Sequence, residues 1–311
     1  MQQPASTPSV ERAALSACQG ADNPEPLVER MIDPLNRYYR YPVARWAVPY
    51  VRRTRVSPNQ LTVLHTAIGL AAAACVVRGS ASARIGACLL AELRLIVDCL
   101  DGVLARATHT ATTYGRTLDA LGDAVSYVAL CMALAVATGA WMLALSVLAA
   151  GALMAWMHDF YARKFSTALR AGTDSVYEQL REKHEAIAAR GAGFVIRFGY
   201  AFDWLQILFL APHARRAIAP RLRDPSGAGD AAAAAGVRSI VAHAHSRRAR
   251  AAFRAVSVVA GDNALAILNV GLLTGRLVAA ERIVLLYGMI AATAGLVLCH
   301  RFLKHAGATA A

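Results

Sequence analysis

Four aspartates occur at regular spacing in an otherwise apolar stretch of this chain. Residues 98–123 read DCLDGVLARATHTATTYGRTLDALGD, and the aspartates are Asp98, Asp101, Asp119 and Asp123. Steps of three and four residues nearly complete a helical turn, so the first two share one helix face and the last two share a face of the next helix. Two carboxylates on each of two adjacent helices form an all-oxygen cage of the kind that Mg²⁺ or Mn²⁺ prefers.

Small residues accompany these aspartates. Gly102, Ala105 and Gly115 leave space where a nucleotide could approach the helix backbone, and Arg106 places a positive charge at the rim of that space. The alternative is that the aspartates are helix caps, solvated charges or partners in ion pairs. Because each carboxylate at membrane depth needs its own compensation, four of them in register favour metal binding.

The elements that position these residues are expected to be membrane helices. The chain has 311 residues, of which 57% are hydrophobic and 17% charged, and its mean hydropathy is +0.39. A soluble protein of this composition would expose too much apolar surface, and a helix needs roughly 20 apolar residues to cross a membrane. We therefore expect an all-α integral membrane fold with six transmembrane helices, at 59–77, 84–105, 117–138, 141–161, 255–275 and 281–303.

The segment before the first span is predicted to be a cytosolic juxtamembrane helix. Residues 31–56 mix Arg with Tyr and Trp, which is typical of a helix on the membrane surface. Ser57, Pro58 and Gln60 then form a capping-box pattern at the start of the first span. The net charge of +13 includes a cluster of arginines in this segment, which predicts cytoplasmic termini and a site facing the cytoplasm. We expect the membrane to be the bacterial inner membrane.

These segments divide the chain into four parts. We expect a flexible cytosolic tail over 1–30, the juxtamembrane helix and spans one to four over 31–161, a basic cytosolic amphipathic insert over 162–253, and spans five and six with a C-terminal tail over 254–311. Within the insert, the sequence predicts a polar helix near 174–189, an amphipathic helix in the membrane interface near 194–209, and a flexible linker over 224–236.

Charged residues inside the spans need partners or a wetted surface. Arg94 precedes Asp98 by four residues on the same face, so it is either a buried counter-charge for the aspartates or, with Glu92, marks a misplaced span boundary. Asp262 and Asn263 in the fifth span are expected either to make helix-packing hydrogen bonds or to mark a span boundary misplaced by a few residues. The fourth span ends in a polar group of residues that either binds a phosphate or head group or forms a solvated helix end. These residues are His158, Asp159, Arg163 and Lys164.

The aspartate segment also resembles a known family signature. The pattern D-x2-D-G-x2-A-R-x8-G-x3-D-x3-D is typical of CDP-alcohol phosphotransferases, and the chain matches every position of it. The resemblance covers about residues 34–165 and implies two metal ions, Mg²⁺ or Mn²⁺, bound to the donor pyrophosphate. It implies that Asp98, Asp101 and Asp119 are ligands and that Asp123 is a ligand, the general base on the acceptor hydroxyl, or both. It also implies that the cytidine and phosphates lie along Gly102, Ala105, Arg106 and Gly115.

The same resemblance implies an enzyme of phospholipid biosynthesis that releases CMP from a CDP-linked donor. The expected donor is CDP-diacylglycerol and the expected acceptor a small polar alcohol. The alternative is a small CDP-alcohol that donates to a lipid hydroxyl, because the signature serves both arrangements. The family also tends to form homodimers.

Other functional classes are less consistent with the sequence. A cation-linked transporter would carry inverted repeats or interrupted helices at midplane depth, whereas these aspartates are predicted near one membrane face. A non-catalytic membrane scaffold would bind CDP-alcohols without turnover. The basic charge is expected to meet anionic membrane lipids, so we predict no nucleic-acid partner.

Overall fold

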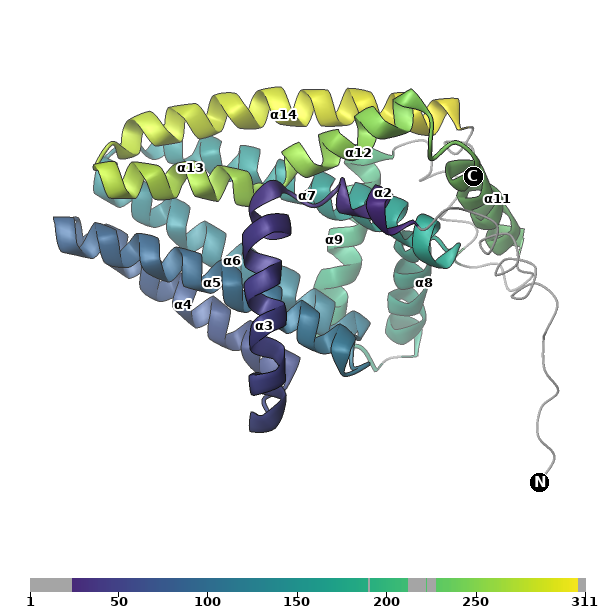
Figure 1. The fold of residues 1–311 in the computed structure, drawn as a ribbon, viewed down its shortest axis with the longest axis horizontal. Coiled ribbons are helices and arrows are strands. Elements are labelled where there is room, and N and C mark those ends of the chain that lie inside the picture. Colours follow the sequence, from purple (N-terminus) through teal and green to yellow (C-terminus); the bar gives the residue numbers. More distant parts are fainter. Residues whose placement is uncertain (1–23, 190, 212–221, 223–227, 307–311) are drawn as a thin grey trace.

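The computed structural model describes residues 24–189, 191–211, 222 and 228–306 (Figure 1). Throughout these residues the regular elements are helices, which confirms the predicted all-α class. Residues 1–23 of the predicted tail lie outside the described residues. The elements are, in chain order, α2 (Glu25–Glu29), a π-helical turn (Asn36–Arg40), α3 (Tyr41–Val51), a 3₁₀ turn (Arg52–Thr54), α4 (Pro58–Arg78), α5 (Ala81–Ala107), α6 (Thr113–Thr138), α7 (Trp141–Ala171), α8 (Ser175–Ala188), α9 (Phe194–Leu210), α11 (Ala228–Ala242), α12 (Arg247–Val259), α13 (Gly261–Thr274) and α14 (Leu277–His305).

The longest helices run beside one another along the long axis of the molecule, whereas α3, α8 and α9 run across it (Figure 1). α4 packs against α5 and α6, and α7 packs against α6, α12 and α14. By length and composition, five helical segments of the described part are fit to cross a membrane: α4, α6, α7, α12 with α13, and α14. The sixth predicted span is α5, which has 27 residues and several charged side chains, and its crossing stays a prediction.

Two predicted spans differ from the helices in the structure. The fourth was predicted to end at 161, but α7 continues to Ala171. The fifth consists of α12 and α13, because the backbone becomes extended at Ala260. Asn263 donates to the carbonyls of Ser257 and Val258, at 3.0 and 3.4 Å, and so satisfies groups that the break frees from the helix.

A buried ion pair binds the juxtamembrane segment to the bundle. Arg40, whose side chain is 1% exposed, donates to both carboxylate oxygens of Glu92 on α5, at 2.7 and 3.0 Å. Asp262 lies 3.5 Å from Arg40 and accepts a hydrogen bond from Asn36. Glu92 therefore has a partner from outside its own helix, and Asp262 makes the packing contact that the sequence predicted. The surface position of α3 stays a prediction.

The segment after α7 is more helical than predicted. The polar helix near 174–189 and the helix near 194–209 are confirmed as α8 and α9, and their position relative to a membrane stays a prediction. The predicted linker over 224–236 is wrong where the structure describes it, because α11 begins at Ala228. A run of alanines has the highest intrinsic helix propensity, which explains the difference.

Candidate active site and metal centre

Close packing of α4 against α6 brings the first span to the aspartates. A side chain at Gly69 would lie 2.6 Å from the Ser126 hydroxyl, and one at Gly122 would collide with Thr66. These glycines therefore permit a helix approach that larger residues would block. The start of α4 has the predicted capping box, in which the Ser57 hydroxyl accepts from the Gln60 N–H at 3.3 Å.

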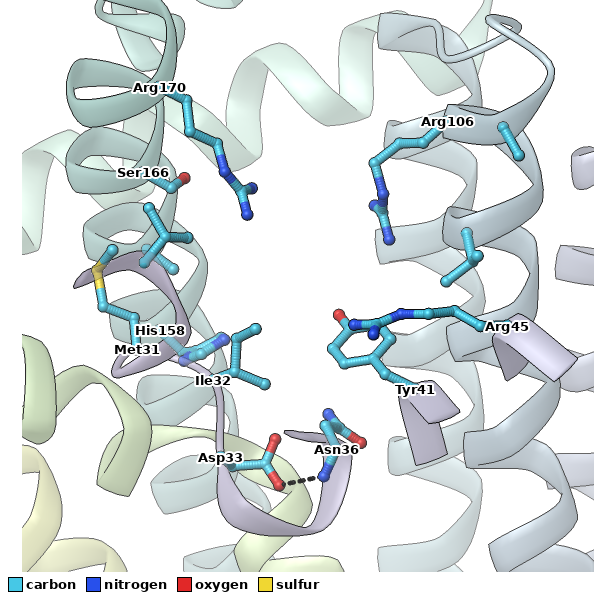
Figure 2. Close-up of a pocket in the computed structure, with 14 residues that line it drawn as sticks. Met31, Ile32, Asp33, Asn36, Tyr41, Arg45, Arg106, His158, Ser166 and Arg170 are labelled. Atoms are coloured by element: carbon cyan, nitrogen blue, oxygen red, sulfur yellow. Dashed lines mark hydrogen bonds between the residues drawn. The ribbon is translucent and has the colours of Figure 1, made fainter. Parts of the chain in front are cut away.

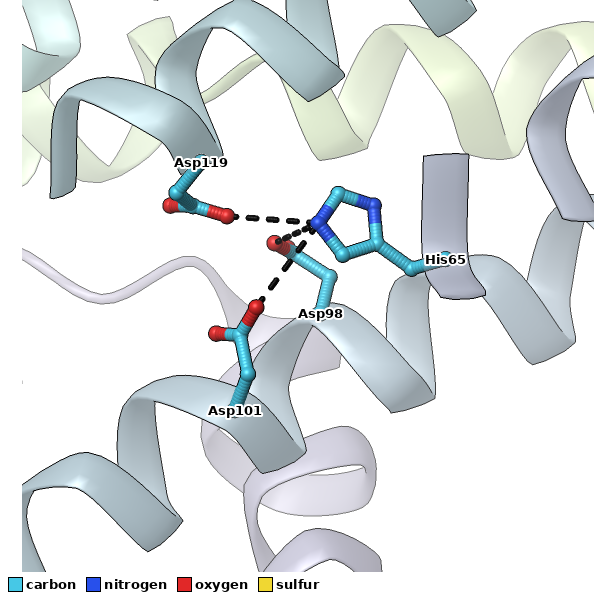
Figure 3. A group of neighbouring side chains, drawn as sticks. All are labelled: His65, Asp98, Asp101 and Asp119. Carbon is cyan, nitrogen blue, oxygen red and sulfur yellow. Dashed lines mark hydrogen bonds and ion pairs between the residues drawn. The ribbon is translucent and has the colours of Figure 1, made fainter. Parts of the chain in front are cut away.

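Three of the four predicted aspartates meet at this crossing. Asp98 and Asp101 project from α5 and Asp119 from α6, and Figure 3 shows their carboxylates directed at one another. With His65 of α4 they form a group in which one potential ligand atom from each residue lies within 4.8 Å of all the others. Thr62 donates to Asp101 at 2.8 Å and so orients that carboxylate.

His65 is the residue of this group that the sequence analysis missed. Its Nε2 lies 3.3 Å from Asp119, 3.7 Å from Asp101 and 3.9 Å from Asp98 (Figure 3). When these carboxylates are ionised they only accept hydrogen bonds, and Nε2 then carries the hydrogen. In the sequence, His65 could have been found by its position, because it follows Thr62 by three residues and so lies on the same face of the first span.

The environment of His65 favours an orienting role over a ligand role. The ring is fully buried, and no described residue forms a hydrogen bond with its Nδ1. A histidine that ligates a metal almost always donates its other ring N–H to an acceptor, and the described part of the chain offers His65 none. Three carboxylates oriented by Thr62 and His65 therefore fit an oxygen-preferring divalent cation, and the predicted all-oxygen ligand set stays a prediction.

Asp123, the fourth predicted aspartate, lies one turn beyond Asp119 and outside this group. It accepts a hydrogen bond from Arg94, and the two side chains form an ion pair. Arg94 is thus a buried counter-charge, which was one of the two hypotheses from the sequence. Its ion-pair partner is Asp123 on α6 and not Asp98 on its own helix.

A cavity of about 370 Å³ opens beside the carboxylates. Asp101 and Asp119 line one part of it, and Pro58, Asn59 and Gln179 line others. All four residues predicted to lie along a nucleotide are also in its wall: Gly102, Ala105, Arg106 and Gly115. The four residues that the sequence predicted to act together therefore share the wall of one cavity. Their contacts with a ligand stay a prediction.

A second cavity of about 560 Å³ shares Arg106 with the first and lies between α5 and α7. Figure 2 shows Arg45, Arg106 and Arg170 directed into it, with Asp33 and His158 at its other end. The His158 Nδ1 lies 3.0 Å from the Val256 carbonyl. Since a carbonyl only accepts, Nδ1 carries the hydrogen, and in the neutral ring Nε2 is left as an acceptor.

The comparisons with known proteins agree with this geometry. A family model described as CDP-alcohol phosphatidyltransferase matches residues 55–209, about half of the chain. The match begins later than the predicted resemblance and reaches further, so it includes α8 and α9 of the predicted insert. No curated protein and no solved structure matched the chain.

Proposed function

The chain belongs to the CDP-alcohol phosphatidyltransferase family and is a membrane-integral transferase of phosphate-containing groups, and we propose that it transfers a phosphatidyl group from CDP-diacylglycerol to a small polar alcohol, releasing CMP. One observation carries this proposal: Asp101 and Asp119 belong both to the carboxylate group and to the wall of the smaller cavity. A CDP-linked donor in that cavity would have its pyrophosphate beside the carboxylates.

In this proposal Asp98, Asp101 and Asp119 hold two divalent cations, Mg²⁺ or Mn²⁺, and Asp123 acts as the base. Bound there, the cations neutralise charge on the transferring phosphoryl group and on the leaving CMP. Gly102, Ala105 and Gly115 leave room for the nucleotide, and Arg106, between the two cavities, attracts the phosphates.

Asp123 is proposed to accept the proton of the acceptor hydroxyl. Arg94 binds its Oδ1, so Oδ2 is left for the acceptor. The positive charge of Arg94 favours the ionised form of Asp123, which a proton acceptor requires before the reaction. Arg94 is thereby a positioning residue that acts through Asp123.

The second cavity supports a small polar acceptor rather than a lipid hydroxyl. Its wall carries three guanidinium groups, from Arg45, Arg106 and Arg170, and buried Asp33. Burial, and then the charge of Asp262, raises the pKa of Asp33. Carboxyl and imidazole groups bind hydroxyls, and guanidinium groups bind anions, so the polar side chains of this wall suit an alcohol with several polar groups. Arg170 is already paired with Glu25, and the rest of the wall includes apolar side chains such as Met31 and Ile32.

The function is tested by CMP release from purified protein. We expect release from CDP-diacylglycerol with a small polar alcohol, none in EDTA, and recovery with Mg²⁺ or Mn²⁺ but poorly with Zn²⁺, because oxygen ligands favour hard cations. Full activity in chelator would refute the metal site. Release only from a small CDP-alcohol with a lipid acceptor would favour the alternative arrangement, and binding without release would favour a scaffold.

We also propose six spans in a bacterial inner membrane, with both termini and the site in the cytoplasm. Tyr38 and Trp46, beside the arginines of the juxtamembrane segment, are 72% and 69% exposed, which suits the interface between head groups and acyl chains. Reporter fusions at residue 311 and near residue 225 should be active only as cytoplasmic reporters, and periplasmic activity at either position would rule out this topology. The homodimer stays a prediction, which cross-linking in native membranes would test.

A further inference from the structure

Helix α8 lies against the part of α6 that lines the smaller cavity. The Thr113 hydroxyl donates to Glu182 at 2.5 Å, and Arg116 donates to Gln179. Of these two α8 residues, Gln179 lines the cavity and Glu182 does not. A helix from the predicted cytosolic insert therefore supplies part of the wall that faces the carboxylates.

Buried ion pairs hold α8 in this place. Lys183 of α8 and Asp203 of α9 form a contact of 2.7 Å, and their side chains are 3% and 1% exposed. Burial lowers the pKa of Lys183, while the neighbouring charge of Asp203 opposes this effect. Arg163 of α7 contacts Asp203 at 3.3 Å and Gln206 at 2.6 Å. The three helices are thus joined by buried polar contacts, which hold α8 beside the cavity.

The chemistry of its neighbours determines which way the Gln179 amide points. Arg116 and Arg163 both donate to Gln179 Oε1, the latter at 3.3 Å. A guanidinium group has no acceptor, so the amide oxygen, and not the nitrogen, must face the two arginines. The amide nitrogen then faces away from them, and its two N–H groups have no hydrogen-bond partner in the described part of the chain.

We propose that Gln179 selects the nucleobase of the donor by donating to the cytosine edge. Cytosine presents two adjacent acceptors, O2 and N3. Uracil has acceptors at O2 and O4 but a donor at N3–H, so an amide N–H that is directed at position 3 is accepted by cytosine and opposed by uracil. The inference rests on the proposed function, because it needs a CDP-linked donor in the smaller cavity. Gln179 is accordingly a specificity-determining residue supplied by α8.

The test compares CMP and UMP binding, and CDP- and UDP-diacylglycerol turnover, in the parent and two variants. Gln179→Glu keeps an oxygen for the arginines but replaces the N–H donors, and Gln179→Met removes both groups. In each variant we expect CMP affinity to fall about tenfold, the loss typical of one hydrogen bond, and the preference for CMP over UMP to shrink similarly. The Michaelis constant for the CDP donor should rise with little change in turnover number, because the contact is present throughout the reaction.

Glu182→Gln is the matched control, since Glu182 docks α8 one turn away without lining the cavity. It should keep the parental preference for CMP, and unfolding temperatures identify any variant that has lost its fold. Equal loss of CMP and UMP binding would mean that Gln179 contacts ribose or phosphate, and would overturn the proposal, as would unchanged binding in both Gln179 variants. If the parent prefers CMP but releases none from any donor, the proposed reaction fails while the role of Gln179 stands.

Discussion

Asp123→Asn is expected to lower turnover by roughly 10²–10⁴-fold while leaving affinity for the CDP-linked donor nearly intact. Asparagine keeps the shape of the side chain and an oxygen for Arg94, but it does not accept the acceptor's proton. The carboxylates that meet His65 come from Asp98, Asp101 and Asp119, so this group is unchanged by the substitution. The measurement is CMP release and donor affinity across a metal titration.

Asp98→Asn is the control for a residue that acts through the metal. It should weaken donor binding, and added metal should restore part of the loss. If Asp123→Asn behaves in the same way, Asp123 is a ligand rather than the base. Near-parental turnover of Asp123→Asn at saturating metal and donor would contradict the mechanism at its central residue.

Arg40→Leu is expected to lower the free energy of unfolding by roughly 3–5 kcal/mol. The substitution removes the partner of Glu92, which Arg40 contacts through two hydrogen bonds, and leaves that carboxylate uncompensated inside the bundle. The loss is measured by thermal or denaturant unfolding in detergent.

Two further variants separate this effect from a general loss of charge. Arg52→Leu changes an exposed arginine of the same segment and should alter stability by no more than about 0.5 kcal/mol. The double variant Arg40→Leu, Glu92→Leu should recover much of the loss, because removing both charges of a buried pair is often neutral. Parental stability of Arg40→Leu alone would show that the ion pair contributes nothing.

The sequence by itself determined the helices and the chemistry of the site. Apolar length predicted the long segments, and Ser57 with Gln60 predicted the start of α4, because capping depends on residues that are neighbours in the chain. The spacing of Asp98, Asp101 and Asp119 placed their carboxylates on two helix faces, since helical periodicity is a local property. The alanine run after residue 228 was predicted to be a linker but is helical, because the helix propensity of alanine outweighs the effect of the few glycines beside it.

Tertiary structure alone decided which residues far apart in the chain became partners. His65 reaches the carboxylates because Gly69 and Gly122 let α4 and α6 approach closely, and no local pattern encodes that crossing. Arg94 has helical neighbours of suitable charge on α5, yet it pairs with Asp123 across a helix interface. Gln179 of α8 enters the cavity wall through contacts with α6 and α7. Each of these contacts depends on the angle and distance at which whole helices pack, which the complete set of side chains determines together.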